Sequence, residues 1–543
     1  MADDGSGGSF ADSACDRTKT RANSVRVASF VIFTHRILPT INRPNNPTEA
    51  TKRRQYQKSA HSGSFVFTTR WQPKVQCYIL CFEDLAHLTG KWEYNMHRSS
   101  PHQRGRNPIS HHRLKFTLAT ISAFYLSLTA QAQLNSNLMK YACGPANRMF
   151  ATLSPTTRYT DATAGFDLLP SPAIESKSCT SDKPFFFSVP IPEGNYRITV
   201  VLGGAAASVT TVRAEGRRLM LEKITTQPNE AITKSFDTNV RYPEISGDPD
   251  NKVRLKPREL GILNWDHKLT LEFNGDHPSV RSIDIEPIPN EPVIYLAGDS
   301  TVVDQYYEPW AAWGQMLPRF FLPGIVIANH AESGETTKSF VGEKRLAKIM
   351  TTMKPGDYLF MQFAHNDMKP GAVSLEDYKK FLTDFVVQTR AKGATPVLVT
   401  PMNRRTFDDA GKITNSFGPY PDAVREVAAE QKAALIDLNA MSKTLFEAMG
   451  REGTLKAFMH YPTDSFPGQT AAIADDTHFN SYGAYELARC IVRGIREANL
   501  PMVKFLDPTV PDFNPALPDS QPAFHLPFTP ILLKSDPTKV GQT

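Results

Sequence analysis

The sequence predicts an α/β protein with a doubly wound parallel sheet, preceded by a β-sandwich. Between residues 293 and 438, short apolar runs alternate with helical patterns. Between residues 133 and 290, short strands of alternating polarity are separated by Gly, Pro and Asn. A chain of 543 residues is also too long for one ordinary hydrophobic core, so we expect more than one domain.

The first region is interpreted as a β-sandwich because its strands are short and have a period of two. The clearest predicted strands are 185–189, 196–202, 208–214, 268–273 and 280–285. Residues 287–292 contain three prolines and are interpreted as a linker.

The second region contains five short apolar runs of the kind that form buried parallel strands. They are 293–297, 325–328, 358–363, 396–399 and 435–438. The clearest helix between them is predicted to begin at Ser374, with Asp377 three residues later, and to end at Gly393. In such a fold the site is expected beyond the carboxyl ends of the strands.

The N-terminal stretch differs in composition from the rest of the chain. Residues 1–132 carry a surplus of ten positive charges, whereas the remainder has a net charge of −4. The basic balance therefore gives no reason to expect nucleic acid as a partner of the folded body. Residues 1–110 mix Arg, Ser, Asn and Pro, and are interpreted as a disordered extension or as an over-extended gene product that truly starts at Leu114.

Residues 111–132 have the pattern of a secretory signal peptide. Arg113 and Lys115 precede an apolar stretch at 116–128, and an Ala-Gln-Ala triplet at 130–132 is typical of a cleavage site. We therefore expect an exported protein, periplasmic or extracellular, that begins at Gln133. The remaining domains are predicted at 133–290 and 291–500, followed by a Pro-rich tail at 501–543 that wraps the surface.

The cysteines are too few and too scattered for a disulfide framework. Cys143 and Cys179 could pair in an oxidising compartment, and Cys490 is the third cysteine beyond the N-terminal stretch. The sequence has no Cys/His spacing typical of a metal site and no further segment long enough to span a membrane. It also lacks a glycine-rich phosphate-binding motif.

Four short segments contain the residue types needed for acyl transfer. They are Gly-Asp-Ser-Thr at 298–301, Asn-His-Ala-Glu-Ser-Gly at 329–334, Gln-Phe-Ala-His-Asn-Asp at 362–367 and Asp-Asp-Thr-His-Phe at 475–479. Each segment alone is weak evidence, because a Gly-Asp-Ser turn is usually only a β-turn. Their order, after predicted strands or before the predicted helix at 481–498, points to one catalytic site.

Ser300 is the predicted nucleophile, and it needs a base because an unactivated serine is a poor nucleophile. His478 is the candidate base, and Asp475 is close enough in sequence to hold its imidazole. Asp476 is the competing carboxylate. We favour Asp475 because a three-residue gap lets the loop curl back toward His478, whereas neighbouring side chains diverge.

A tetrahedral intermediate also needs hydrogen-bond donors for its oxyanion. The Gly334 N–H can approach closely because glycine lacks a side chain, and the Asn366 amide is a neutral donor. The N–H of Ser300 would be a third donor. The predicted catalytic residues are therefore Ser300, Gly334, Asn366, Asp475 and His478.

These segments resemble the SGNH, or GDSL-type, hydrolase superfamily, and more closely the rhamnogalacturonan acetylesterase-like enzymes of carbohydrate esterase family 12. The resemblance covers roughly residues 293–500 and includes a Trp-Gly-Gln sequence at 313–315. It implies a flavodoxin-like fold and a cofactor-free serine esterase that removes acetyl groups from pectin or xylan. It also implies that the preceding region is a galactose-binding-like module. Ala364 departs from the family pattern, which usually has glycine there, so the oxyanion loop is expected to be slightly altered.

Several neighbouring residues have less certain roles. His365 and His330 either line the cleft or satisfy buried backbone groups, and Asp299 is expected to bind the backbone of its own turn. Trp310, with Trp313 and Tyr306, could form a sugar platform, although helix packing is the commoner role for such residues. His365 and Trp310 are the predicted substrate-binding residues.

The expected partner is an acetylated polysaccharide or oligosaccharide, with no nucleic acid. Three alternatives remain open from the residues. One is an esterase for longer acyl chains, similar to a lipase or thioesterase. The second is a carbohydrate-binding protein whose catalytic site has decayed, which the intact set of four segments disfavours. Glycosidase chemistry by paired carboxylates would leave Ser300 and His478 without a role.

Overall fold

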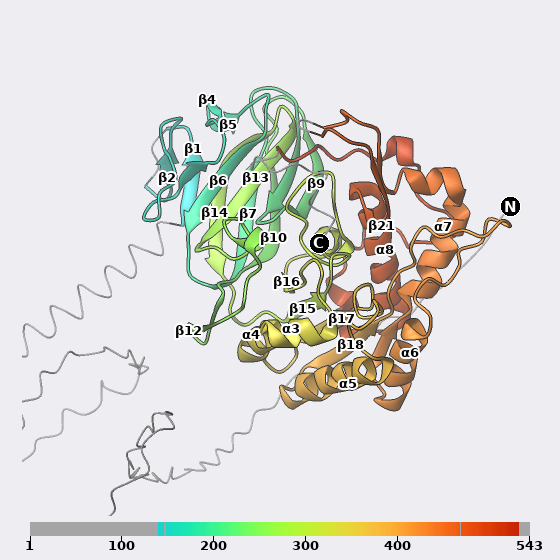
Figure 1. Ribbon diagram of the computed structural model, residues 1–543. Coiled ribbons are helices and arrows are strands. Elements are labelled where there is room, and N and C mark those ends of the chain that lie inside the picture. Colours follow the sequence, from blue (N-terminus) through green and yellow to red (C-terminus); the bar gives the residue numbers. More distant parts are fainter. Residues whose placement is uncertain (1–138, 146–147, 467–468, 531–543) are drawn as a thin grey trace, which may run out of the picture. The chain divides into compact units, whose positions relative to one another are not determined.

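The computed structural model describes residues 139–145, 148–466 and 469–530 (Figure 1). The predicted N-terminal extension (1–110) and signal peptide (111–132) lie outside the described residues, as does the end of the predicted tail. The described chain has two parts that differ in secondary structure. The name "β segment" is used here for residues 140–287, and "α/β segment" for residues 293–497.

The β segment consists almost entirely of strands in two larger, mostly antiparallel sheets. One has the order β10 (Ile232–Val240), β7 (Gly194–Leu202), β14 (Ser279–Pro287), β1 (Lys140–Cys143) and β2 (Ala151–Leu153), with β4 (Ala173–Glu175) and β5 (Ser178–Thr180) attached through β14. The other has the order β3 (Gly165–Asp167), β6 (Phe185–Pro190), β13 (Lys268–Asp276), β8 (Ser208–Ala214) and β9 (Arg218–Thr226).

The two sheets of the β segment share one hydrophobic core. In β7, buried side chains alternate with more accessible ones, so Ile198 and Val200 point inward. They belong to the same buried cluster as Phe187 of β6 and Leu271 of β13. A small additional hairpin, β11 (Glu244–Ile245) with β12 (Asp248–Lys252), precedes a short 3₁₀ helix, η2 (Pro257–Glu259).

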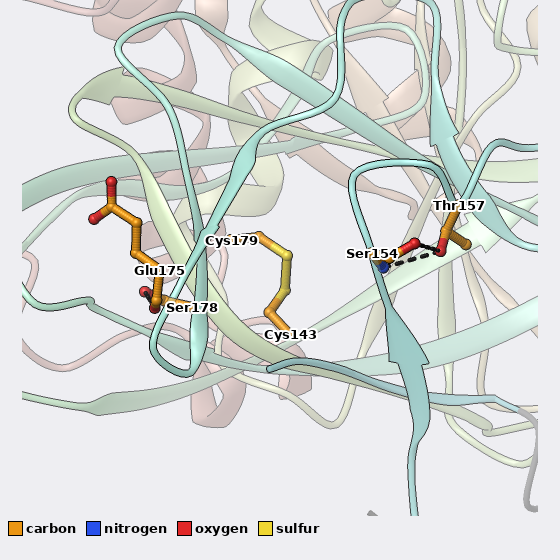
Figure 2. The surroundings of a disulfide bond; sticks show 6 residues. All are labelled: Cys143, Ser154, Thr157, Glu175, Ser178 and Cys179. Carbon is orange, nitrogen blue, oxygen red and sulfur yellow. Dashed lines mark hydrogen bonds between the residues drawn. A yellow bond between two sulfur atoms is a disulfide. The ribbon is translucent and has the colours of Figure 1, made fainter. Parts of the chain in front are cut away.

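A disulfide bond joins Cys143, at the end of β1, to Cys179 in β5 (Figure 2). Both side chains belong to the core cluster of the β segment. The bond closes a sequence separation of 36 residues, so it ties the first strands of this segment together. Cys490 is a free thiol, buried in the last helix.

The α/β segment confirms the predicted doubly wound parallel sheet. Its five strands pair in parallel in the order β16 (Val326–Asn329), β15 (Val293–Gly298), β17 (Tyr358–Gln362), β18 (Thr395–Val399) and β19 (Ala434–Ile436). Each predicted strand matches an observed one to within two residues at either end. These strands are almost continuously buried, as expected for a sheet that is covered on both faces.

Helices cover both faces of this sheet (Figure 1). On β15, Ile294 and Leu296 belong to one core cluster, whereas Tyr295 and Ala297 belong to the other. The first cluster includes α2 (Trp313–Met316), η3 (Leu317–Phe320), α7 (Leu438–Leu455) and α8 (Ser481–Glu497). The second includes α3 (Thr337–Gly342), α4 (Arg345–Thr352), α5 (Leu375–Ala391) and α6 (Tyr420–Glu430).

The cap predicted for α5 is present. The Ser374 hydroxyl accepts a hydrogen bond from the N–H of Asp377, which satisfies one of the free donors at the helix start. The helix ends one residue before Lys392, and Gly393 follows with a positive φ of 72°.

The segment containing His478 differs from the expectation. Asp475 and His478 were predicted on a loop that curls back, but they lie on β21 (Ile473–Phe479), which pairs with β20 (Phe458–Tyr461). A register shift near Phe458 interrupts this hairpin. The Asp475 carboxylate accepts hydrogen bonds from the N–H groups of Thr477 and His478, so the strand makes a turn-like contact within itself.

The tail after residue 500 contains η4 (Pro501–Phe505) and η5 (Gln521–Ala523), and its described end contacts the β segment. The Asn274 amide donates to the carbonyl of Phe528 at 2.9 Å, and the Thr529 hydroxyl donates to Glu272 at 2.8 Å. The Thr529 N–H donates to Glu308 of the α/β segment at 3.0 Å. The tail therefore connects both segments.

No helix among the described residues combines the length and the apolar character that a membrane span requires. No group of three or more His, Cys, Asp and Glu side chains in the same residues could hold a metal ion.

Candidate active site

Three of the four predicted segments follow neighbouring strands of the parallel sheet. Ser300 follows β15, Gly334 follows β16 and Asn366 follows β17. Gly298 pairs with Gln362, so the carboxyl ends of β15 and β17 lie side by side. The sheet thus brings together residues that are more than thirty positions apart in the sequence, at the edge where sites in such folds occur.

The turn after β15 is held by Asp299. Its carboxylate accepts hydrogen bonds from the N–H of Thr301 at 3.0 Å and from the Thr301 hydroxyl at 2.7 Å. Asp299 therefore binds the backbone of its own turn. The carbonyl of Ser300 accepts a hydrogen bond from the Gln305 amide, and 8% of the Ser300 residue is exposed.

His478 contacts Ser300 on one side and Asp475 on the other. Its Nε2 lies 2.8 Å from the Ser300 hydroxyl oxygen, and its Nδ1 lies 2.7 Å from the Asp475 carboxylate. Asp476, the competing carboxylate, points elsewhere and contacts His460 and Arg405. The chain therefore aligns a hydroxyl, an imidazole and a carboxylate, the arrangement that activates a serine nucleophile.

The pKa of Asp475 is lowered to about 2 by its surroundings. Burial alone would raise this pKa. The hydrogen bond and charge of His478, together with the N–H groups of Thr477 and His478, oppose burial and prevail. Asp475 is thus held as a carboxylate beside the imidazole.

The two predicted oxyanion donors lie on the loops after β16 and β17. Gly334 has a φ of 76°, a conformation that glycine adopts without steric cost. Asn366 is buried, and its amide donates one hydrogen bond to the carbonyl of Glu335 at 3.0 Å. A primary amide has a second N–H, so this bond leaves one donor for another acceptor.

His365 is placed against Asp299 and is not on an open surface. Only 2% of the residue is exposed, and its Nδ1 lies 3.4 Å from the Asp299 carboxylate. Burial lowers the pKa of His365, while the charge of Asp299 opposes this change. His365 was predicted to bind substrate, and its burial against Asp299 leaves little of its ring for direct contact with a sugar.

Trp310 is also enclosed. It is 2% exposed and packs against Met459 and Ile473, and its carbonyl accepts from Arg217. Its ring therefore offers no open face on which a sugar could stack, so packing is its role here. His330 is likewise buried and packs against Trp265 and Tyr295.

Two residues that support the site open two of the quoted segments, but the sequence alone indicated no role for them. Gln362, the last residue of β17, donates to the Thr301 hydroxyl and accepts from the Trp313 indole, both at 2.7 Å. Asn329, the last residue of β16, donates to the carbonyl of Val302 and to Asp304. A polar residue that ends an apolar strand is the signal that could have indicated both.

The fold and this arrangement are those of a carboxylic ester hydrolase. The chain belongs to the GDSL-like lipase/acylhydrolase family, whose profile matches residues 296–485. That match begins in β15 and ends in α8, so it includes all five predicted catalytic positions.

Two similar proteins come from Bacillus subtilis (strain 168). The rhamnogalacturonan acetylesterase RhgT is 42% identical over 212 residues, which is 38% of this chain and 91% of that protein. The probable rhamnogalacturonan acetylesterase YesY is 36% identical over 219 residues, or 39% and 95% of the two chains. The solved structure of YxiM, from the same species, is 26% identical and covers 67% of this chain and 99% of that one, with a TM-score of 0.38.

Proposed function

We propose that this protein is a serine acetylesterase that deacetylates a plant cell-wall polysaccharide. The observation that carries the proposal is the continuous contact from Asp475 through His478 to the Ser300 hydroxyl. The similarity to two proteins named rhamnogalacturonan acetylesterase or probable rhamnogalacturonan acetylesterase supports the acetyl group and the pectic substrate.

In the first half of the proposed reaction, the Ser300 hydroxyl oxygen attacks the acetyl carbonyl, and His478 Nε2 takes the proton of that hydroxyl. Asp475 stabilises the imidazolium that forms and keeps Nδ1 protonated. The N–H groups of Ser300 and Gly334 and the Asn366 amide bind the oxyanion. When the tetrahedral intermediate breaks down, His478 gives its proton to the sugar hydroxyl, which leaves, and Ser300 carries the acetyl group.

In the second half, a water molecule takes the place of the sugar. His478 removes its proton while the water oxygen attacks the acetyl-serine carbonyl. Breakdown of the second intermediate returns the proton to Ser300 and releases acetate. The chain's own residues perform each of these steps.

The same proposal includes export of the protein and a role of the β segment as a carbohydrate-binding type of domain. The predicted signal peptide and the pairing of Cys143 with Cys179 support a periplasmic or extracellular location, because disulfides persist in oxidising compartments. We propose that the β segment is a β-sandwich of the galactose-binding type, supported by its two sheets around one core.

The test is acetate release from acetylated pectin and acetylated xylan by the protein that begins at Gln133 and by its Ser300→Ala variant. We expect release by the first and a loss of at least about 10³-fold in the second. The Ser465→Ala variant is the matched control, since Ser465 is an exposed serine outside the site. Equal release by Ser300→Ala would refute the nucleophile.

A series of p-nitrophenyl esters tests the acyl group. Preference for acetate over butyrate and octanoate is expected for an acetylesterase. Preference for octanoate would instead identify an enzyme for longer acyl chains.

A further inference from the structure

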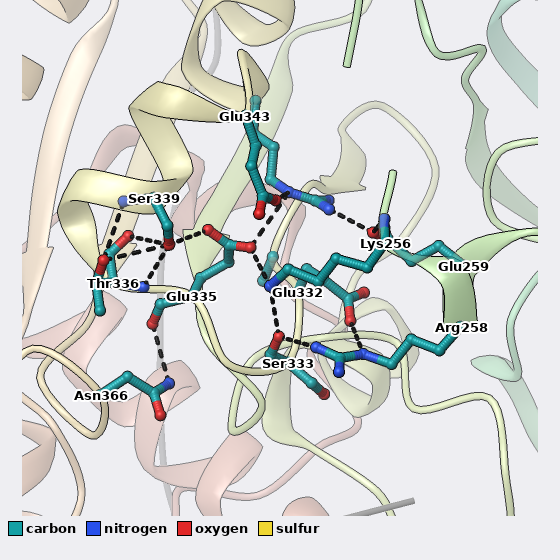
Figure 3. Close-up of polar contacts among 12 residues, drawn as sticks. Lys256, Arg258, Glu259, Glu332, Ser333, Glu335, Thr336, Ser339, Glu343 and Asn366 are labelled. Carbon is teal, nitrogen blue, oxygen red and sulfur yellow. Dashed lines mark hydrogen bonds and ion pairs between the residues drawn. The ribbon is translucent and has the colours of Figure 1, made fainter. Parts of the chain in front are cut away.

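Two cations of the β segment meet at the peptide group between Ser333 and Gly334 (Figure 3). The Lys256 ammonium donates a hydrogen bond to the Ser333 carbonyl at 2.8 Å. The Arg258 guanidinium donates to the same oxygen and, through Nε, to Glu332 at 2.8 Å. Both side chains come from the η2 region between β12 and β13, outside the part that matches the family profile.

This carbonyl belongs to the same peptide group as the Gly334 N–H. A trans peptide is planar, and its C=O and N–H point in opposite directions. Fixing the Ser333 oxygen therefore fixes the direction of the Gly334 N–H. Glycine at a φ of 76° has few steric restraints of its own, so the loop needs such an external contact to hold one orientation.

The cations also polarise the peptide group. Hydrogen bonds in a chain strengthen one another, and those from charged donors are about twice as strong as neutral ones. A carbonyl that accepts from both an ammonium and a guanidinium draws electron density away from its N–H. That N–H becomes a stronger donor toward a developing negative charge.

Lys256 reaches the next residue of the loop as well. It forms an ion pair with the buried carboxylate of Glu335, which also lies 3.7 Å from Arg345 and accepts from Ser339. The Glu335 carbonyl in turn accepts from the Asn366 amide (Figure 3). The same contacts therefore restrain both Gly334 and Asn366.

We propose that Lys256 and Arg258 are positioning residues of the esterase, which orient and polarise the Ser333–Gly334 peptide as an oxyanion donor. The inference rests on the proposed function, because it requires the Gly334 N–H to face the oxyanion. It gives the β segment a part in the chemistry, in addition to any binding of carbohydrate.

The test uses the protein from Gln133 onward with p-nitrophenyl acetate, a substrate too small to need the β segment for binding. The variants are Lys256→Met, Arg258→Met and Arg258→Lys. Arg254→Met is the matched control, since Arg254 lies on the same loop and contacts Gly342 but not Ser333. Thermal unfolding is measured for each.

Lys256→Met and Arg258→Met are each expected to lower kcat about tenfold with KM within about twofold, less than the 10²–10³-fold loss typical when an oxyanion donor is removed outright. Arg258→Lys restores most of the activity, because it keeps a cation near the carbonyl. Arg254→Met leaves kcat unchanged. Affinity for a trifluoromethyl ketone, whose serine adduct carries the oxyanion, falls in parallel with kcat/KM.

If Arg258→Met does not fold, Lys256→Met decides the test. Burial already raises the pKa of Glu332 to about 7, so removing Arg258 leaves a poorly compensated carboxyl, whereas Glu335 keeps Arg345 when Lys256 is replaced. An unchanged kcat in folded Lys256→Met, or a lower Tm without loss of kcat and ketone affinity, overturns the inference. An inactive parent protein would instead overturn the proposed function.

Discussion

The Arg218 guanidinium donates to the Asp304 carboxylate at 2.7 Å, and both side chains are almost completely buried. Arg218 begins β9, whereas Asp304 lies four residues after Ser300. Asp304 also accepts a hydrogen bond from Asn329 at the end of β16. The pair therefore ties the β segment to the turn that carries the predicted nucleophile.

Breaking this pair is expected to be costly. Arg218→Met leaves the buried Asp304 carboxylate with the more distant Arg241, at 4.0 Å, and should lower the free energy of unfolding by about 3 kcal/mol. Lys379→Met, which breaks an exposed pair with Glu426, should leave the free energy of unfolding nearly unchanged. Urea unfolding measures the change in the free energy of unfolding for both variants. Equal changes would contradict the argument that the buried pair contributes more than the exposed one.

Asp475 and Asp476 form a matched pair for kinetics. Asp475→Asn is expected to lower kcat by roughly 10³–10⁴-fold, because an amide can favour the wrong imidazole tautomer. Asp476→Asn should change kcat by less than about twofold, since Asp476 contacts His460 and Arg405 and not His478. A similar loss in both variants would argue against the assignment of Asp475.

Asp475 also predicts how stability depends on pH. Its pKa of about 2 in the folded protein lies below the unfolded value near 3.9, so the folded state binds fewer protons. The resulting stabilisation, on the order of 2 kcal/mol, is fully present above roughly pH 5 and is lost as pH falls toward 2. The stability difference between the parent and Asp475→Asn should thus widen from pH 3 to about pH 5 and then stay constant. A difference that narrowed over this range would have the wrong sign.

Ala364 combines complete burial with a φ of 118°, a conformation that residues with a side chain rarely adopt. Ala364→Gly loses a methyl group but releases backbone strain, so we expect no net loss of stability. Ala297→Gly, at an equally buried alanine of β15 outside the positive-φ region, should cost about 1.5 kcal/mol from the methyl group and glycine's added flexibility. Calorimetry measures the stability of the two variants relative to the parent protein. Equal losses of stability would show that Ala364 carries no backbone strain.

The disulfide predicts a difference between oxidised and reduced protein. Replacing Cys143 and Cys179 together by alanine removes a cross-link across 36 residues and should lower the free energy of unfolding by about 3–4 kcal/mol. Cys490→Ala, at the buried free thiol, should respond to reductant as the parent does. Urea unfolding with and without dithiothreitol measures the free energy of unfolding of the oxidised and the reduced protein. A parent protein insensitive to reductant would contradict the prediction.

The parallel sheet could be predicted because its strands are buried on both faces and so form continuous apolar runs. Ser300 and Asn366 could be placed because each follows such a run. The strand at β12 could not, because its sequence, Asp-Pro-Asp-Asn-Lys, has low strand propensity and pairs only in a small hairpin with β11. The same holds in part for β9, where Glu222 and Lys223 interrupt the alternation.

The buried surroundings of the site were harder to predict than its chemistry. An aromatic residue such as Trp310 can serve as a platform for a sugar ring. Its ring is covered by Met459, and this tertiary contact cannot be deduced from the sequence. Lys256 and Arg258 lie about 75 residues before Ser333, on a loop that carries no recognisable motif. Lys and Arg side chains are common on protein surfaces, and a hydrogen bond from one of them to a carbonyl far away in the sequence produces no recognisable sequence pattern.

The C-terminal tail has a consequence for how this architecture can be inherited. Phe528 and Thr529 supply partners to Asn274, Glu272 and Glu308, so the last described residues satisfy polar groups in two other parts of the chain. A gene fusion that transferred only residues 296–485 would separate the buried Glu308 carboxylate from its partners Arg217 and Thr529. Moving the β segment, the α/β segment and the tail together keeps these contacts, whereas moving one of them alone breaks them.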